Sequence, residues 1–184
     1  MNIHNELNQW ANEMLDFHLP RWNELPEIEL YMDQLIILIE RYLAPLNIEK
    51  DHMITPAMVN NYVKLKLLPP PIKKRYHRVH IAYLLAITLF KQVFSLSTIY
   101  DAITQHSFRL GEKHAYNLFC EKQELELRRT LSNLLNHQEI VKNEPIADED
   151  IILTFATLAL VNKVIVQKTM YLHNNKTTKD IQNT

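Results

Sequence analysis

Apolar residues recur every three or four positions along most of this chain, which is the pattern of amphipathic helices. In the first such segment Ile3, Leu7, Trp10 and Met14 share one face, and the segment stops before Pro20 because the residue preceding a proline disfavours helical geometry. The segments that we expect to be helical are about residues 2–17, 27–43, 55–65, 78–94, 98–106, 112–141 and 151–173. Strand-like alternation is scarce, so the pattern predicts an all-α fold.

The segment 55–65 has a clear start signal. Thr55 can cap a helix through its hydroxyl, and Pro56 suits the first helical position. The residues on the inward side are Val59, Tyr62 and Val63. The residues on the outward side are Ala57, Asn60, Asn61 and Lys64. In contrast, the segment 78–94 is apolar almost all round, which predicts a central helix.

Two long helices are predicted in the C-terminal part, joined by the polar loop Asn143-Glu144-Pro145. A short connection favours an antiparallel helical hairpin, which we place at residues 107–173. Because the apolar surface of this hairpin exceeds what two helices can bury, we expect it to dock on residues 1–106, on a second copy, or on both, and we predict a homodimer. The polar residues 174–184 are expected to be disordered.

Glycine is nearly absent, since Gly111 is the only one in 184 residues. Tight hairpins and the phosphate loops of nucleotide folds need residues at positive φ, so these folds are disfavoured. The single cysteine, Cys120, excludes an internal disulfide and is expected to be a small buried side chain instead of a sensor thiol. The N-terminus shows no secretory signal and the apolar runs are too short to span a bilayer, which favours a cytoplasmic protein without membrane contact.

Positive charge is concentrated in one part of the chain. Residues 50–92 hold eight Lys and Arg residues against Asp51 alone, a net charge of +7, and the remainder therefore carries −8 in a chain whose total is −1. The near-neutral total conceals a basic lobe that is suited to phosphates. The cations of this lobe that we predict to contact DNA are Lys64, Lys66, Lys73, Lys74, Arg75 and Arg78.

A short basic tip follows the helix 55–65. Leu67-Leu68 anchors the chain, Pro69-Pro70-Pro71 stiffens it, and Lys73-Lys74-Arg75-Tyr76 presents three cations. Asparagine can pair with N6 and N7 of adenine, and lysine with guanine or phosphate, so the outward side of the helix and the tip together would hold DNA at two points. For the helix taken alone, the alternative is a merely solvated polar face.

The run TPAMVNNYVKLKLLPPP, followed by KKRY, a helix and SLSTI, resembles the MerR-type winged helix. With the preceding LPRWNELPEIELYMDQ, the layout from about Leu19 to His106 is similar to an uncharacterised bacterial family described as domain of unknown function 1836. The resemblance implies a recognition helix at about 55–65 and a short wing at about 69–76. The residue roles that it implies are Thr55 as helix cap, Asn60, Asn61 and Lys64 as groove-facing residues, Tyr62 as inward anchor, and Lys74, Arg75 and Tyr76 as wing contacts. Lys66 departs from the MerR pattern, which has glycine at the helix end, and the wing is shorter than the usual MerR hairpin.

Enzyme chemistry is not indicated by the sequence. It contains no nucleophile elbow, phosphate loop or Cys/His metal spacing, so we expect no catalytic activity, cofactor or metal. His77 and His80 lie three residues apart and could share an ion, but without a nearby carboxylate or cysteine in sequence they are expected to be ordinary surface histidines. Glu112, Glu121 and Glu124 are expected to form a solvated face.

The sequence therefore predicts an all-α protein with a MerR-like winged helix-turn-helix domain within residues 1–106 and a C-terminal antiparallel helical hairpin. The expected function is that of a sequence-specific transcriptional regulator that binds double-stranded DNA as a homodimer, and no motif identifies a small-molecule effector. The alternative is a non-catalytic module that uses the same basic surface to bind an acidic protein or RNA.

Overall fold

The computed structural model describes residues 3–136 and 146–182, with side chains for residues 3–136 and 146–176. The α-helices are α1 (Ile3–Met14), α2 (Met32–Leu43), α3 (Pro56–Lys64), α4 (Arg78–Phe90), α5 (Leu96–Leu110), α6 (Glu112–Leu134) and α7 (Ile151–Gln182). Extended pairing in these ranges is limited to two isolated β-bridges. The prediction of an all-α fold is confirmed.

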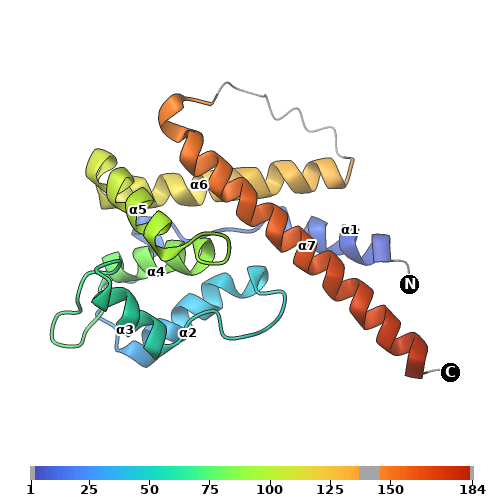
Figure 1. Cartoon of the computed structure of the whole chain (residues 1–184), viewed down its shortest axis with the longest axis horizontal. Helices are drawn as coiled ribbons and strands as arrows, with labels where there is room; N and C mark the ends of the chain where they lie inside the picture. Colours follow the sequence, from blue (N-terminus) through green and yellow to red (C-terminus); the bar gives the residue numbers. More distant parts are fainter. Residues whose placement is uncertain (1–2, 137–145, 183–184) are drawn as a thin grey trace.

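Helix α4 lies between α2 and α3 on one side and α5 and α6 on the other (Figure 1). It packs against α2, α5, α6 and α7, and nine of its thirteen residues are buried. Its sequence, RVHIAYLLAITLF, has apolar side chains on all faces, which suits a helix surrounded by others. The predicted central position of this helix is confirmed.

The first helix packs against the last two. The buried face of α1, formed by Leu7, Trp10, Ala11 and Met14, meets α6 and α7, which follow it by about a hundred residues or more. The buried residues form one cluster that extends from α1 to α7. The structure therefore has a continuous core across residue 106, where the sequence suggested a division.

The prediction of an antiparallel hairpin for α6 and α7 is wrong. Lys122 Nζ lies 3.0 Å from Asp150 Oδ2, and Arg109 also reaches Asp150, so α7 begins beside the first half of α6. Figure 1 shows the two helices crossing while running in the same general direction. Helix α6 ends at Leu134, earlier than the predicted end near residue 141. The expected short turn at Asn143-Glu144-Pro145 lies outside the described residues.

Several predicted helix ends also differ. Helix α2 begins at Met32 because Leu30 pairs instead with the backbone of Tyr76. Helix α5 is longer than expected: Ser95 caps it by accepting from Thr98 N at 3.2 Å, and Gly111, at φ 76°, ends it and starts α6. Helix α7 continues to Gln182, through most of the segment that was expected to be disordered.

Four helices leave an apolar cavity of about 330 Å³ between them. Its lining contains six alanines, contributed by α4, α5, α6 and α7: Ala82, Ala86, Ala102, Ala115, Ala156 and Ala159. Phe155 and Ile152 of α7 also line this cavity and are more than half exposed. The packing of these helices within one chain is therefore incomplete on the α7 side.

Candidate nucleic-acid interface

Helix α3 presents a polar face to solvent. Thr55 Oγ1 accepts a hydrogen bond from Met58 N at 3.3 Å, so the predicted cap is present, with Pro56 at the first helical position. Val59 and Tyr62 are buried, whereas Val63 is only half-buried. The exposed residues of the helix include Ala57, Asn60, Asn61 and Lys64. The predicted inward and outward sides are thus confirmed, and the outward side offers amides and one ammonium group.

Helix α3 ends in a left-handed residue, and that residue is Lys66, with φ 59°. Leu67 N donates to Tyr62 O at 2.9 Å and Lys66 N donates to Val63 O at 3.0 Å, which is the hydrogen-bond pair of a Schellman motif. Glycine usually occupies this position because a Cβ strains the left-handed conformation by about 1 kcal/mol or more. The ammonium group of Lys66 is therefore held beside α3 at a conformational cost.

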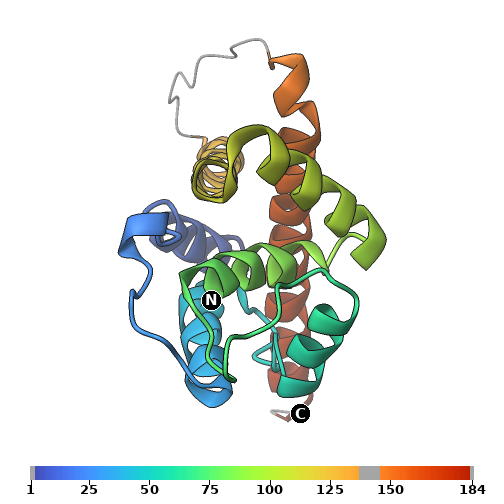
Figure 2. The same cartoon turned by 90° about the vertical axis from the view of Figure 1, so that its left-hand side faces the viewer.

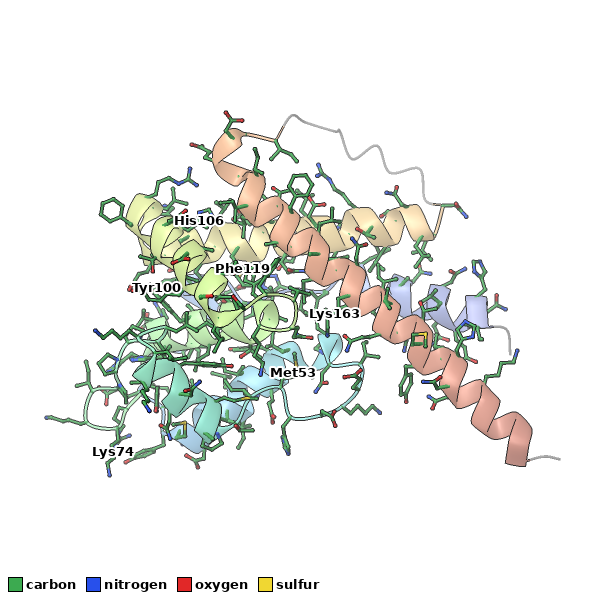
Figure 3. All side chains as sticks on the ribbon, in the orientation of Figure 1. Met53, Lys74, Tyr100, His106, Phe119 and Lys163 are labelled. Carbon is green, nitrogen blue, oxygen red and sulfur yellow. The ribbon has the colours of Figure 1, made fainter. Side chains whose placement is uncertain are left out.

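The predicted wing is a two-residue hairpin turn. Ile72 N donates to Arg75 O at 3.1 Å and Arg75 N donates to Ile72 O at 2.9 Å. Lys73 and Lys74 form the tip with φ values of 49° and 63°, and positive φ at both central residues defines the type I′ turn that Asn-Gly usually makes. Two lysines therefore occupy strained positions at the end of the hairpin, where Figure 3 shows Lys74 pointing away from the body of the molecule.

The base of the wing is fastened to the segment before α2. Leu30 and Tyr76 exchange both backbone hydrogen bonds at 2.9 Å, and the Arg75 guanidinium lies 3.7 Å from the centre of the Tyr31 ring. Tyr76 is only 3% exposed, so its prediction as a DNA contact is wrong in this structure: the side chain packs inward, edge-on to His80. Tyr31, which the sequence did not single out, positions Arg75 by a cation–π contact.

Arg78 also has a structural role. Its guanidinium donates to Leu25 O at 3.2 Å and to Glu27 Oε1 at 3.0 Å, so it holds the segment before Leu30 against α4. Its charge is thereby partly neutralised. In contrast, Lys64, Lys66, Lys73 and Lys74 are exposed and form no ion pair with any residue that the structure describes. These four lysines are the cations available to an anionic partner on this surface.

His80 secures the start of α4 beneath the wing. It is buried, which corrects the expectation of a surface histidine. His77 N donates to its Nδ1 at 2.9 Å, and its Nε2 lies 3.4 Å from Pro70 O, an arrangement that a neutral imidazole protonated on Nε2 satisfies. Burial lowers the pKa of His80, which favours this neutral form. No group of three His, Cys, Asp or Glu residues suited to a metal occurs in the part of the chain that the structure describes.

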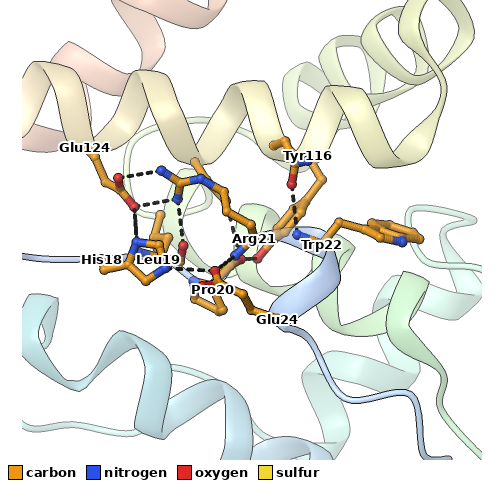
Figure 4. Close-up of polar contacts among 10 residues, drawn as sticks. His18, Leu19, Pro20, Arg21, Trp22, Glu24, Tyr116 and Glu124 are labelled. Carbon is orange, nitrogen blue, oxygen red and sulfur yellow. Dashed lines mark hydrogen bonds and ion pairs between the residues drawn. The ribbon is translucent and has the colours of Figure 1, made fainter.

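An ion pair holds the segment that leads to the wing base (Figure 4). Arg21 donates to both oxygens of Glu124 at 2.6 Å, and Leu19 N donates to Glu124 Oε1 at 2.7 Å. His18 Nδ1 lies 3.2 Å from the same carboxylate. The prediction that Glu124 belongs to a solvated face is therefore wrong, because its part-buried carboxylate anchors residues 18–21. No local sequence signal links Arg21 to a glutamate more than a hundred positions later.

The two turns of α6 that precede Glu124 complete this anchor. Tyr116 donates its hydroxyl to Pro20 O at 2.6 Å, and Asn117 Oδ1 accepts from Trp22 N at 2.8 Å. Cys120 is fully buried beside Pro20, and burial raises its pKa to about 12, which keeps the thiol protonated. The prediction of a buried structural cysteine is confirmed.

The connection between α2 and α3 does not match a helix-turn-helix of the usual form. It runs from Ala44 to Thr55 and contains the 3-10 turn Ala44–Leu46, whereas the usual turn has three or four residues. Figure 2 shows α3 and the start of α2 at the same end of the molecule, below α6. The geometry therefore supplies an exposed helix beside a basic hairpin without establishing a MerR-like topology.

These features define an all-α protein with a short polar helix, a basic hairpin and a central buried helix. The chain belongs to the family described as Domain of unknown function (DUF1836), whose model matches residues 20–119. That match begins at the segment anchored by Glu124 and ends in α6, so it includes α3, the wing and α4. No curated protein and no solved structure matches the chain. No described helix is long and apolar enough to cross a membrane.

Proposed function

We propose that this protein is a sequence-specific DNA-binding transcriptional regulator of MerR-like type. In this proposal α3 enters the major groove, where Asn60 and Asn61 read base edges and Lys64 contacts guanine or phosphate. Lys66 and the Lys73-Lys74 tip contact backbone phosphates on either side. The base contacts would read the sequence, and the phosphate contacts would fix the register of the protein on the duplex.

The observation that carries this proposal is the conformation of the lysines. Four exposed lysines have positive φ in the described part of the chain. Lys66, Lys73 and Lys74 flank the polar face of α3, and the fourth, Lys50, lies in the connector between α2 and α3. Each left-handed side chain costs about 1–2 kcal/mol that glycine would avoid. Strain of this kind concentrates at functional sites, and retaining lysine at the three positions that flank α3 favours an anionic partner.

The test separates charge from turn geometry. Replacing Lys73 with Asn and Lys74 with Gly removes both cations and supplies the preferred Asn-Gly turn, so the hairpin is retained. Genomic duplex fragments selected by the wild-type protein are then titrated across a salt series. The variant should bind every duplex more weakly, and its plot of log affinity against log salt should flatten by about two phosphate contacts.

Substitutions in α3 should affect DNA binding differently from the tip variant. Asn60→Ala and Asn61→Ala are expected to weaken the selected site by about 1–3 kcal/mol each while leaving non-specific binding nearly unchanged. Asn5→Ala, an exposed asparagine on α1, is the matched control and should have no effect. If the variant with Lys73→Asn and Lys74→Gly binds DNA with the affinity and the salt dependence of the wild-type protein, the proposed contact between the wing and DNA is contradicted.

A second candidate function is a non-catalytic module that binds an acidic protein or RNA. It is favoured by apolar side chains that stand exposed near the cations: Ile28, Tyr31, Leu65 and Ile72. A DNA backbone offers little to such side chains, whereas a protein partner or an unstacked RNA base can cover them. This candidate predicts no enrichment of duplex fragments in the same selection.

We also propose that the regulator is a homodimer that associates through α7. The side chains of Ile152, Phe155, Val166 and Met170 are each more than half exposed, and they recur at helical spacing along this helix. Exposed apolar side chains that recur along one helix are typical of a protein–protein contact. The two-fold arrangement would bring two copies of α3 to two half-sites.

A further inference from the structure

A second cavity lies on the inner side of α7, apart from the surface described above. It has a volume of about 210 Å³ and is enclosed by the end of α4, the middle of α7 and the connector of residues 46–53. Lys91 of α4 and Lys163 of α7 both line it. Figure 3 shows Lys163 close to Met53 of the connector, which lines the same cavity.

The two lysines carry charge that no carboxylate balances at close range. Lys163 Nζ donates to Gln92 Oε1 and to Gln167 Oε1, each at 2.9 Å, and Lys91 Nζ lies 3.3 Å from the thioether sulfur of Met58. Neither forms an ion pair with a described residue, and burial lowers the pKa of both. Half-buried cations normally have anionic partners, because desolvation penalises an unpaired charge.

Two further polar groups in the same wall lack partners. Gln92 Nε2 and Thr88 Oγ1 are buried and have no hydrogen-bond partner among the described residues, and both residues line the cavity. Thr88 is fully buried. Since most buried polar groups in native proteins are hydrogen-bonded, these atoms indicate space for a ligand group that accepts hydrogen bonds.

The acidic residues of the cavity lie at its rim. Glu49 and Asp51 are exposed, and His52, also exposed, pairs with Glu40 at 2.9 Å. The charge of Glu49 raises the pKa of Lys163 slightly against the larger effect of burial, but Glu49 is beyond ion-pair distance. Lys91 lies at the C-terminal end of α4, where the helix dipole stabilises its positive charge. Lys163 lies in the middle of α7 and has no such stabilisation.

We propose that this cavity binds a small anion through a phosphate or carboxylate group, held by Lys91, Lys163, Gln92 Nε2 and Thr88 Oγ1. The proposal does not depend on DNA binding. Because Lys91 also contacts Met58 of α3, an anion seated here would join α7 to the helix that carries the polar face.

The experiment titrates the full-length protein, labelled with ¹⁵N, with sodium phosphate and separately with sodium succinate at constant ionic strength and pH 7. Either anion should cause saturable shifts of the amide signals centred on Thr88, Gln92 and Lys163, with half-saturation in the millimolar range. A dissociation constant of about 1 mM corresponds to a binding free energy of about −4 kcal/mol. Saturation by one anion and not by the other would identify the group that the cavity prefers.

Variants test the assignment. Lys163→Gln should weaken binding at least tenfold, and Lys163→Arg should restore most of it, because the charge is retained. Lys168→Gln is the matched control on the same helix, since Lys168 lies over the Trp10 ring outside this cavity. The proposal is overturned if neither anion gives saturable shifts with the wild-type protein, or if Lys163→Gln binds as tightly as Lys168→Gln.

Discussion

Removing the Glu124 carboxylate should destabilise the protein, although this residue is far from α3. In Glu124→Ala, the Arg21 guanidinium loses both of its hydrogen bonds to the carboxylate and the Leu19 amide loses its acceptor. Breaking a buried ion pair on one side typically costs 3–5 kcal/mol. The Glu124 side chain is 11% exposed but that of Arg21 is 25% exposed, so solvent screening places our expectation near the lower limit, at about 3 kcal/mol.

The assay is denaturant unfolding of the variant and of two controls. Glu121→Ala, an exposed glutamate one turn earlier on α6, should change the unfolding free energy by less than about 0.5 kcal/mol. Adding Arg21→Met to Glu124→Ala should recover part of the loss, because the guanidinium is then no longer left unpaired. A Glu124→Ala variant as stable as Glu121→Ala would refute the anchor, and the fastening of residues 18–21 would need another cause.

The same ion pair should appear in the pH dependence of stability. Burial alone would raise the pKa of Glu124, but the hydrogen bonds from Arg21 and Leu19 outweigh it and the pKa lies below its ordinary value. The stabilisation by this ion pair is therefore fully present above the pKa of Glu124 in the unfolded chain, about 4.3. It is lost as the pH falls through the lower pKa that Glu124 has in the folded protein. Glu124→Ala should flatten the acid limb of the stability curve.

Three further predictions concern Lys66, His80 and assembly. Lys66→Gly should raise the unfolding free energy by roughly 0.5–1 kcal/mol, because relief of the left-handed strain exceeds the added freedom of the unfolded chain; lower stability in denaturant melts would contradict the strained helix end. Burial lowers the pKa of His80, so the stabilisation that depends on neutral His80 should be fully present above about pH 6.5 and should decline at lower pH. His80→Gln should reduce this pH dependence of the unfolding free energy in melts from about pH 7.5 to 5.5. Light scattering at micromolar concentration should give about twice the chain mass, whereas Phe155→Ser should give a monomer; a monomeric wild-type protein would contradict dimerisation through α7.

Local signals predicted the local structure well. The Thr55-Pro56 start of α3, the inward position of Tyr62 and the burial of α4 all follow from rules that act within one or two turns of helix. The MerR pattern expects glycine at the position of Lys66, and Lys66 adopts there the left-handed conformation that glycine favours. The pattern correctly predicts that the helix ends at residue 66. By itself it does not show whether Lys66 takes a strained left-handed conformation there or continues the helix.

Features set by distant contacts could not be predicted. Glu124 reads as one of several glutamates on a charged helix, and only the folded chain brings Arg21 to it. Tyr76 reads as part of a basic tip, yet its pairing with Leu30 turns the side chain inward. The direction of α7 is likewise seen only in contacts between residues distant in the sequence, because Asp150 lies beside Arg109 and Lys122.

The packing of α1 against α6 and α7 has a consequence for synthesis on the ribosome. The helices that cover Leu7, Trp10 and Met14 are translated about a hundred residues or more after α1, so the apolar face of α1 has no native partner until they are made. At 5–20 residues per second, a hundred residues take roughly 5–20 s. Burial of α1 therefore waits for the synthesis of α6 and α7, and during this interval its apolar face is accessible to chaperones that bind nascent chains.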